Sequence, residues 1–278
     1  MIRKACVIGW PIKHSRSPIV HRFWLNELGI EGDYVIQPVE PERAAIFLAR
    51  FAESGYVGGN VTVPHKETAY AAVARREPAA RAIGAVNTLW LEDGVLVGTN
   101  TDATGFLANL DQEAPGWDRS RGTALVLGAG GAARAIAWAL TTRGFARIHV
   151  VNRTSARAAA LAERFGATVL PAGPDALPAL LAEADVLINT TSLGMEGQPP
   201  LAIDLAPLKK SAIVNDLVYV PLTTPLLAAA RARGLVAVDG LGMLLHQAVP
   251  GFERWFGVRP TVTPALRAAL LADLGRKG

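Results

Sequence analysis

The chain has 278 residues, of which 50% are hydrophobic and 19% are charged, so it can bury a large core and is long enough for two domains. The net charge is +4, but the Lys and Arg residues are scattered and no basic run alternates with aromatic residues, so we expect no nucleic-acid partner. The single cysteine, Cys6, cannot form an intrachain disulfide, and no apolar stretch is long enough to span a bilayer. We therefore expect a cytoplasmic protein without a membrane partner.

The first hundred residues alternate between strand-like and helix-like stretches. Strands are predicted at residues 4–9, 33–39 and 57–63, and helices at residues 18–28 and 41–54. A further helix is predicted at residues 65–76, with an interruption or restart at Pro78. Strands at residues 85–91 and 95–99 flank a hairpin turn, Glu92-Asp93-Gly94. The order βαβαβ predicts an α/β unit with a mostly parallel sheet.

The second part of the chain begins near Thr104 and also alternates, after a polar stretch at residues 109–121. Strands are predicted at residues 123–127, 147–151, 167–170, 185–189, 212–217 and 235–238. Helices are predicted from the glycines after residue 127 to residue 140, and at residues 156–165 and 175–183. This pattern predicts a doubly wound parallel sheet. The tail is helical at residues 243–255 and 264–274, so the chain divides into residues 1–104, 105–242 and 243–278.

A glycine-rich turn joins the strand at residues 123–127 to the following helix, with the spacing GxGxxA. Gly128 allows a sharp turn, Gly130 lets the backbone approach a diphosphate, and Ala133 keeps the helix close to the strand. The helix N-terminus favours negative charge, because its first N–H groups are free and its dipole is positive there. Although an isolated glycine motif often binds nothing, here a strand and a helix flank it. We assign to a dinucleotide the residues Gly128, Ala129, Gly130, Gly131 and Ala132.

The end of the next strand indicates which dinucleotide is bound. NAD-binding domains carry an acid there that holds the ribose 2′-hydroxyl, but residues 145–157 contain neither Asp nor Glu. This strand ends instead in Asn152-Arg153-Thr154, and Arg157 follows. Guanidinium groups suit a 2′-phosphate, so the sequence predicts NADP as the cofactor. The alternative is that both arginines are simply solvated, but the missing acid argues against NAD independently.

Three polar clusters in the first hundred residues are candidates for a substrate site. Ser15 and Ser17 stand beside a helix start and suit a carboxylate, although such serines are often only turn and cap residues. A second cluster lies where a strand passes into a helix, and the third lies where the two hairpin strands meet. These two clusters contain Asn60, Thr62 and Lys66, and Asn87 with Asn100-Thr101-Asp102.

The motifs around these residues together resemble those of the shikimate dehydrogenase family, and the resemblance covers nearly the whole chain. The motifs in the first part are Ser15-x-Ser17-Pro18, Asn60-Val61-Thr62-Val63-Pro64-x-Lys66, Gly84-Ala85-Val86-Asn87-Thr88 and Asn100-Thr101-Asp102. Later motifs are Gly128-Ala129-Gly130-Gly131-Ala132, Asn152-Arg153-Thr154, Asn189-Thr190-Thr191, Asp216-Leu217-Val218-Tyr219 and Gly240-x-Gly242-Met243-Leu244-x-x-Gln247. Each motif alone is weak, but their order and spacing are specific.

The resemblance implies an N-terminal α/β substrate domain, a Rossmann NADP domain, and C-terminal helices that return to the substrate domain. It implies that NADPH reduces 3-dehydroshikimate to shikimate, a step of chorismate and aromatic amino acid biosynthesis. Lys66 and Asp102 would be the catalytic pair, and Ser15 and Ser17 would hold the substrate carboxylate. The rest of the substrate would contact Asn60, Thr62, Asn87, Tyr219 and Gln247. The cofactor would also contact Thr190, Leu217, Gly240 and Met243, and no metal ligand is assigned.

The sequence differs from the most frequent family motifs at Trp10, in the first loop, and at Ala103, after Asp102. Neither position is a proposed site residue. A quinate or quinate/shikimate dehydrogenase remains an alternative, although paired serines and the arginines after the strand favour the NADP-linked shikimate enzyme. A regulator that senses NADP without chemistry is a second alternative, against which the presence of both Lys66 and Asp102 argues. The residues do not indicate an oligomeric state, and a homodimer is left open.

Overall fold

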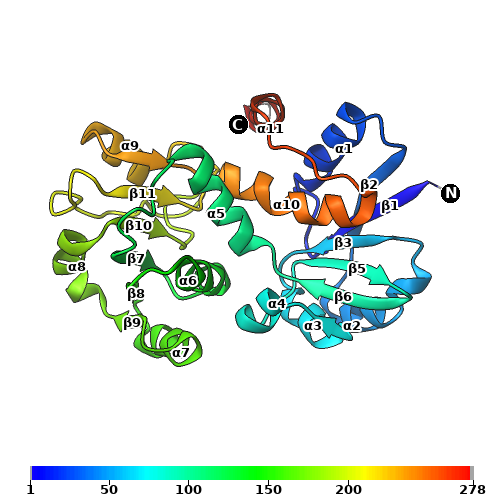
Figure 1. The fold of residues 1–278 in the computed structure, drawn as a ribbon, viewed down its shortest axis with the longest axis horizontal. Helices are drawn as coiled ribbons and strands as arrows, with labels where there is room; N and C mark the ends of the chain where they lie inside the picture. Colours follow the sequence, from blue (N-terminus) through cyan, green and yellow to red (C-terminus); the bar gives the residue numbers. More distant parts are fainter. Residues whose placement is uncertain (1, 276–278) are drawn as a thin grey trace. The chain divides into compact units, whose positions relative to one another are not determined.

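A computed structural model describes residues 2–275, and its contacts divide the chain into two units (Figure 1). The first unit contains the chain up to Asp102 and from Leu245 onward, and the second contains Ala103–Leu244. Each unit is an α/β structure built on a six-stranded sheet, which confirms the predicted fold class. None of the helices within residues 2–275 is both long and apolar enough to cross a bilayer.

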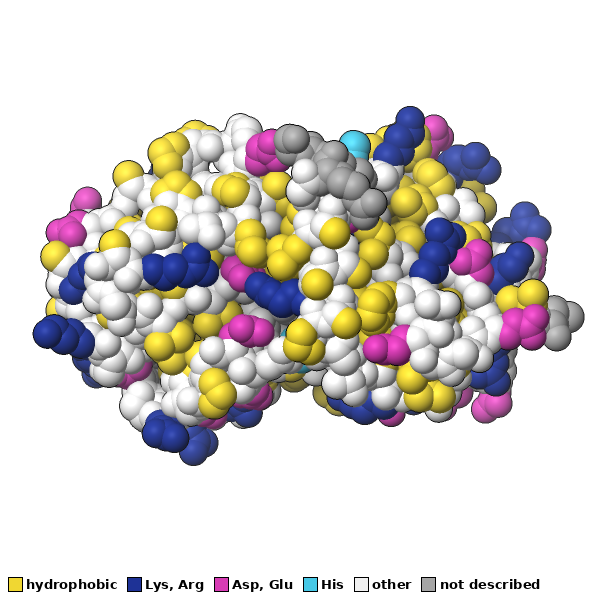
Figure 2. Space-filling model, turned by 90° about the horizontal axis from the view of Figure 1, so that it is seen from above, with side chains coloured by type: hydrophobic (Ala, Val, Ile, Leu, Met, Phe, Trp, Pro, Cys, Tyr) yellow, Lys and Arg dark blue, Asp and Glu magenta, His cyan; other side chains and the backbone are white. Residues whose placement is uncertain are grey.

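The charged side chains do not gather by sign on the face shown in Figure 2. Lys and Arg side chains are spread over that face, and Asp and Glu side chains lie among them. The small positive net charge of the sequence is therefore not concentrated there into one basic patch.

The sheet of the first unit is mixed, with the strand order β2-β1-β3-β5-β6-β4. Its strands are β1 (Arg3–Gly9), β2 (Gly32–Pro38), β3 (Gly58–Val61), β4 (Arg75–Arg76), β5 (Thr88–Glu92) and β6 (Val95–Thr99). Strand β1 pairs in parallel with both β2 and β3, so the predicted βαβαβ arrangement is confirmed. Strands β5 and β6 pair antiparallel, as the hairpin turn predicts.

Helices cover both faces of this sheet. They are α1 (Ser17–Glu27), α2 (Pro41–Ala49), the short 3-10 helix η1 (Phe51–Glu53), α3 (Lys66–Ala72), α4 (Pro78–Ile83), α10 (Leu241–Phe256) and α11 (Pro264–Gly275). Figure 1 shows α2, α3 and α4 on one side, and α1 with the C-terminal helices on the other. The return of the C-terminal helices to the first unit agrees with the sequence expectation.

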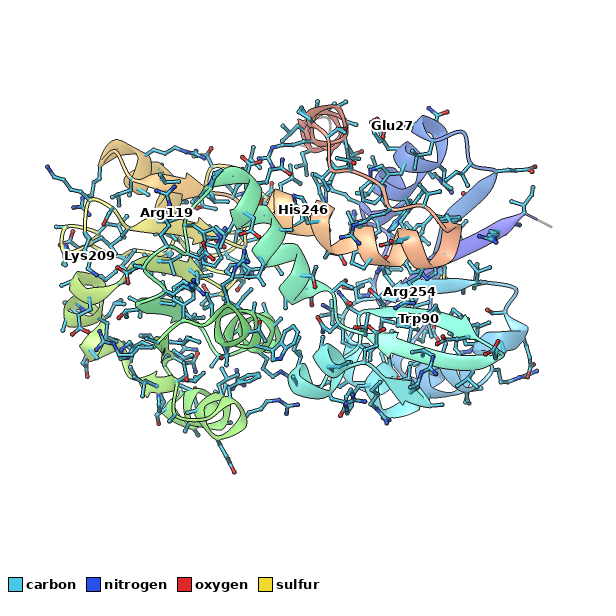
Figure 3. All side chains as sticks on the ribbon, viewed as in Figure 1. Glu27, Trp90, Arg119, Lys209, His246 and Arg254 are labelled. Carbon is cyan, nitrogen blue, oxygen red and sulfur yellow. The ribbon has the colours of Figure 1, made fainter. Side chains whose placement is uncertain are left out.

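The C-terminal helix α10 completes the core of the first unit. The Trp255 indole lies against Gly58 and donates a hydrogen bond to the Leu89 carbonyl at 2.8 Å. Figure 3 labels Arg254 and Trp90, and the Arg254 guanidinium lies 4.7 Å from the Trp90 ring centre. Because Gly58 has no Cβ, the indole of Trp255 can approach the β3 backbone closely enough to form this contact.

A fully buried histidine lies in the same aromatic core. The His21 ring, on α1, stacks on the Tyr34 ring with 4.0 Å between ring centres, and Phe252 and Trp255 pack around it. Burial lowers the pKa of His21 from 6.5 to about 3, against a smaller opposing effect of the Asn60 side chain. The folded protein therefore keeps His21 neutral at pH values where the unfolded chain protonates it.

Acidification is expected to destabilise the protein through His21. Between pH 6.5 and about 3 the unfolded state binds the extra proton, so the free energy of unfolding should fall by up to about 1.4 kcal/mol per pH unit. His21→Phe keeps an aromatic ring and removes the titration, so its urea unfolding should depend less on pH. Exposed His14→Gln is the matched control. Equal pH dependence in the wild type and His21→Phe would contradict the assignment.

The second unit has an all-parallel sheet with the strand order β12-β11-β10-β7-β8-β9. Its strands are β7 (Thr123–Leu127), β8 (Arg147–Val151), β9 (Val169–Ala172), β10 (Val186–Asn189), β11 (Ile213–Asp216) and β12 (Val236–Val238). Its helices are α5 (Asp102–Glu113), α6 (Gly131–Arg143), α7 (Ser155–Phe165), η2 (Pro174–Ala176), α8 (Leu177–Glu183) and α9 (Pro225–Ala232). Figure 1 shows α6 and α7 on one side of the sheet and α8 and α9 on the other, as in a doubly wound fold.

Several predicted elements need correction. The polar stretch at residues 109–121 begins inside α5, whose buried face contains Ala103, Phe106 and Leu110. A second unpredicted helix, α9, starts after Thr224, whose hydroxyl accepts a hydrogen bond from the Leu227 amide. The strand predicted at residues 85–91 starts at Thr88. The helix predicted at residues 41–54 ends at Ala49, with η1 after it, and the one predicted at 65–76 ends at Ala72, before β4.

Candidate active site

In the first unit, four of the predicted site residues follow the carboxyl ends of two neighbouring strands. Ser15 and Ser17 follow β1, and Thr62 and Lys66 follow β3, which is paired with β1. The Thr62 amide donates to the Ile8 carbonyl at 2.9 Å, and the Trp10 amide donates to the Val63 carbonyl at 3.2 Å. The two loops are therefore joined by backbone hydrogen bonds at the edge where α/β sheets place ligands.

Lys66 and Asp102 form an ion pair in which the Lys66 Nζ donates to Asp102 Oδ2 at 2.5 Å. Each residue is the first of its helix, Lys66 of α3 and Asp102 of α5. The Asp102 amide donates to Asn100 Oδ1 at 3.0 Å. The lysine side chain is 30% exposed and the aspartate side chain 17%, so water reaches the pair and a ligand can reach it too.

Asn87 holds Asp102 from the other side. Its Nδ2 donates to Asp102 Oδ1 at 2.8 Å, so the two carboxylate oxygens contact different partners. Its Oδ1 accepts from the Thr101 amide at 2.8 Å, which fixes the orientation of the Asn87 side chain. Gln247 Oε1 lies 3.5 Å from both Asn87 Nδ2 and Thr101 Oγ1. Gln247, a residue of α10, thus lies next to Asn87 and Thr101, which flank the hairpin strands β5 and β6.

Asn60 is buried next to this cluster and is held by two residues, Tyr34 and Thr88, that were not predicted as site residues. The Tyr34 hydroxyl donates to Asn60 Oδ1 at 2.6 Å, and Asn60 Nδ2 donates to Thr88 Oγ1 at 3.2 Å. Nδ2 also donates to the Asn87 carbonyl at 3.2 Å, so both amides belong to one network. Tyr34 lies on β2, and no motif in the sequence around it indicates a role in the site. Thr88, in contrast, belongs to the motif at residues 84–88.

The two serines after β1 differ in exposure. Ser17 is buried and is the first residue of α1, and its amide donates to Ser15 Oγ at 3.4 Å. Ser15 is half-buried. The hydroxyls stand together at a helix N-terminus, where the dipole favours a carboxylate.

Ser15→Ala or Ser17→Ala is expected to weaken shikimate binding about tenfold or more, because a hydroxyl facing a carboxylate contributes about 1.5 to 3 kcal/mol. NADP⁺ binding should stay near the wild-type value, since the serines and the glycine-rich turn belong to different units. Separate titrations of the two ligands measure this. Ser54→Ala removes a hydroxyl that only serves a turn and is the control. Unchanged shikimate affinity would show that the two serines only stabilise the turn and do not bind the substrate.

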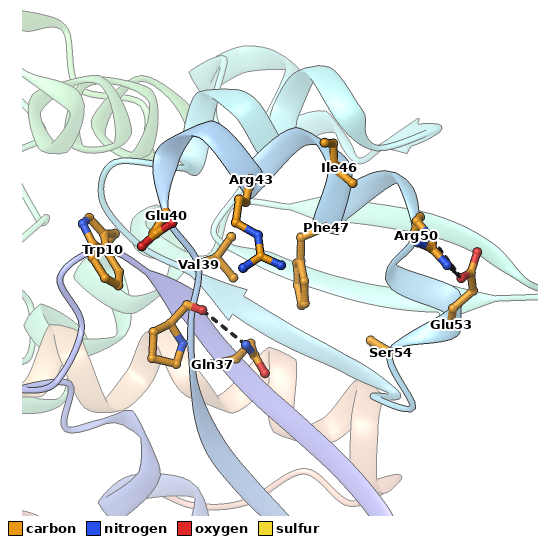
Figure 4. Close-up of a pocket in the computed structure, with 11 residues that line it drawn as sticks. Trp10, Gln37, Val39, Glu40, Arg43, Ile46, Phe47, Arg50, Glu53 and Ser54 are labelled. Atoms are coloured by element: carbon orange, nitrogen blue, oxygen red, sulfur yellow. Dashed lines mark hydrogen bonds and ion pairs between the residues drawn. The ribbon is translucent and has the colours of Figure 1, made fainter.

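A separate hollow of about 420 Å³ lies along α2 in the first unit (Figure 4). Figure 4 shows the Arg43 side chain between Val39 and Phe47, with Trp10 at one end. None of the candidate site residues lines this hollow. Trp10 lines this hollow and also begins the loop that carries the serines.

In the second unit, the glycine-rich turn lies where the strand order reverses, between β7 and β10. Gly128 has φ +99°, and a Cβ there would lie 2.9 Å from Thr190 Oγ1, so only glycine fits. A Cβ on Gly130 would meet no atom of the described residues within 4 Å, so the backbone is open to a ligand. Gly130 precedes α6 and offers no side-chain cap, which leaves the first-turn N–H groups for a diphosphate.

The end of β8 carries the residues expected to select NADP. Arg153 and Arg157 are exposed, and neither guanidinium forms a hydrogen bond or ion pair within residues 2–275. Asn152 Nδ2 donates to the Thr154 carbonyl at 2.9 Å and closes the turn between β8 and α7. Two free guanidinium groups at the end of the second strand fit a 2′-phosphate, so the residues present suit NADP.

The remaining cofactor candidates follow β10, β11 and β12, on the other side of the glycine turn. Thr190 Oγ1 donates to the Leu127 carbonyl at 2.7 Å. Gly240 packs directly on the Leu217 backbone, and its amide donates to the Val218 carbonyl at 3.3 Å. Met243 lies on α10 within this unit. Tyr219, expected to contact substrate, also belongs to this unit rather than to the one with the serines.

The fold and the two polar sites define a dinucleotide-binding protein with a substrate unit of its own, and comparison with known proteins narrows the class. Family models match residues 7–89 (shikimate dehydrogenase substrate binding domain), 111–195 (shikimate / quinate 5-dehydrogenase) and 240–271 (shikimate 5′-dehydrogenase C-terminal domain). A shikimate dehydrogenase (NADP(+)) of Azorhizobium caulinodans is 60% identical over 277 residues, covering 100% of this chain and 99% of that protein. The chain belongs to the shikimate dehydrogenase family.

Solved structures of related dehydrogenases have the same fold as this chain. The shikimate 5-dehydrogenase of Thermus thermophilus, in complex with NADP(H) and shikimate, has a TM-score of 0.84 and 38% identity, covering 98% of this chain and 100% of that chain. The quinate dehydrogenase of Corynebacterium glutamicum, in complex with NAD, has a TM-score of 0.89 and 30% identity, covering 98% and 99%. Both substrate types therefore occur on this fold.

Proposed function

We propose that this chain is an NADP-dependent shikimate dehydrogenase, which reversibly reduces 3-dehydroshikimate to shikimate in chorismate and aromatic amino acid biosynthesis. The observation that carries the proposal is the ion pair of Lys66 and Asp102 at 2.5 Å, located at the carboxyl edge of the first sheet. A second observation, the exposed arginines after β8, supports NADP.

Lys66 and Asp102 would carry out the proton transfer. NADPH, when bound, supplies the hydride for the substrate carbonyl carbon. The Lys66 ammonium stabilises the negative charge that develops on the oxygen and donates the proton. Asp102 would aim the amine, because Asn87 fixes the other carboxylate oxygen. Oxidation of shikimate runs the transfer backward, so Lys66 would then accept the proton that it donates during reduction.

The polar residues around the pair would orient the substrate. Ser15 and Ser17 would hold its carboxylate at the start of α1. The hydroxyl groups would contact Asn60, Thr62, Asn87, Tyr219 and Gln247. Tyr34 and Thr101 already fix Asn60 and Asn87, so these amides have defined orientations before the substrate binds.

An absorbance assay at the nicotinamide band tests the proposal. With 3-dehydroshikimate, NADPH should be consumed, and NADH should be used much less efficiently. Parallel reactions with quinate and NADP⁺ measure the alternative activity found in the family. NADPH binding without turnover on any of these substrates would instead support a sensor of the cofactor.

For location and assembly we propose the cytoplasm and a homodimer. The one cysteine, Cys6, is buried and unpaired, as expected in a reducing compartment. Sedimentation of the purified protein decides the assembly state, and fractionation of cells decides the location.

A further inference from the structure

Asp216, the last residue of β11, is a fully buried acid with three hydrogen-bond donors around it. Its Oδ1 accepts from Asn189 Nδ2 at 2.9 Å and from the Val218 amide at 3.0 Å. Its Oδ2 accepts from Thr224 Oγ1 at 2.6 Å. Burial raises the pKa of Asp216, and the three hydrogen bonds oppose this effect. The donors come from three different places, at the end of β10 and at both ends of the loop that follows β11.

Through Asn189, Asp216 fixes the loop that follows β10. The Asn189 amide turns its Nδ2 toward Asp216 and its Oδ1 away, because Oδ1 can accept from a backbone N–H but Nδ2 cannot. That Oδ1 accepts from the Thr191 amide at 3.0 Å and from Thr191 Oγ1 at 2.7 Å. Asn189 Nδ2 also donates to the Leu193 carbonyl at 3.2 Å. One amide orientation thus holds residues 190–193.

This loop lies against the glycine-rich turn. Thr190 and Thr191 are the residues that a Cβ on Gly128 would meet, both at 2.9 Å. The loop therefore borders the point where the strand order reverses, and its position relative to Gly128 depends on Asn189.

The same carboxylate fixes the segment after β11. The Val218 amide and the Thr224 hydroxyl bind its two oxygens, so the chain from Leu217 to Thr224 is held at both ends. The arginines after β8 would hold the 2′-phosphate, and the adenosine would then lie on one side of β7. The other half of a bound dinucleotide then extends toward β10 and β11, the side that Asp216 organises.

We propose that Asp216 is a positioning residue for the nicotinamide half of NADP, an assignment that rests on the proposed function. It acts through Asn189, Val218 and Thr224, which set the two loops around the nicotinamide, and it does not touch the cofactor itself. The adenosine half, bound at β8 and α6, should be insensitive to it.

The test compares the binding of whole NADP⁺ with that of 2′,5′-ADP, which lacks the nicotinamide half. Asp216→Ala should lower NADP⁺ affinity about tenfold or more, because three buried donors lose their acceptor, and should leave 2′,5′-ADP affinity within about twofold of wild type. Asp216→Asn keeps Oδ1 for two of the donors and should restore most of the affinity. Asn189→Ala should reproduce the loss, since it releases Thr191.

Asn215→Ala is the matched control, because Asn215 is equally buried on the same strand but donates to the Val238 carbonyl on β12. Asn215→Ala should destabilise the protein, but it should not lower the NADP⁺ affinity more than the 2′,5′-ADP affinity. The proposal is overturned if Asp216→Ala weakens both ligands equally, or weakens NADP⁺ no more than Asn215→Ala does. If wild-type protein binds neither ligand, the proposed function fails instead. A folded Asn189→Ala keeps the test decisive should Asp216→Ala not fold.

Discussion

Lys66→Ala is expected to lower the turnover number by roughly 10² to 10⁴, the usual range for a general acid or base, while the Michaelis constant for shikimate changes modestly. The reason is that the ammonium stabilises charge on the substrate oxygen mainly in the transition state. Its 2.5 Å contact with Asp102 shows that a neighbour already positions the amine. Steady-state kinetics in both directions measures the effect.

Two further substitutions separate charge from proton transfer. Lys66→Arg keeps the positive charge but cannot release a proton near neutral pH, so it should restore substrate binding without restoring turnover. Asp102→Asn keeps the shape and removes the charge that supports the ammonium, and should also lower turnover. If the pair acts as a unit, the double variant should be little worse than Lys66→Ala alone.

A Lys66→Ala enzyme with near-normal turnover and only a raised Michaelis constant would make Lys66 a binding residue. The proton donor would then have to be another group. Glu67→Gln is the matched control, because Glu67 is the adjacent charged residue of α3 and has no proposed role.

Replacing both Arg153 and Arg157 with glutamine should raise the Michaelis constant for NADPH tenfold or more, because each charge-assisted contact with a 2′-phosphate contributes about 1.5 to 3 kcal/mol. The constant for NADH should barely change, since NADH carries no 2′-phosphate. Both guanidinium groups are exposed and form no hydrogen bond or ion pair in the described part of the chain, so the substitutions remove no side-chain contact of that kind.

A control for general charge effects removes two positive charges at the other end of the same sheet. Lys210 precedes β11 and Arg119 precedes β7, and both side chains are exposed. Their double replacement by glutamine should leave both Michaelis constants nearly unchanged. Equal changes for NADPH and NADH in the arginine variant would exclude the 2′-phosphate assignment.

The cofactor half of the molecule was the more predictable one because its signals are local. Gly128, Gly130 and the run of residues after β8 all act within one strand-turn-helix unit, where spacing determines geometry. The two missed helices also carry local signals: Thr224-Pro225 marks a helix start, and Ala103, Phe106 and Leu110 repeat at helical spacing. Polar residues around Asn109 and Asp111 hid the second signal.

The substrate half depends on contacts between distant segments, which no local pattern encodes. Tyr34 orients Asn60 across 26 positions, and Gln247 reaches Asn87 across 160. Asp216 likewise acts on Asn189 from a different strand. The sequence names most of the residues that would touch ligands, through the family resemblance, but it does not name those that hold them in place.

The discontinuous first unit has a consequence for the order of events during synthesis. Ribosomes release domains from the N-terminus, and domains generally fold in that order. Here residues 103–244 lie between the two parts of the first unit, and Trp255 and Phe252, which pack around His21, come after them. The nucleotide-binding unit is therefore fully synthesised while its predecessor still lacks α10. The half of the protein that begins first is the last to close its core, so truncated chains ending near residue 244 expose the face of the first sheet that α10 covers.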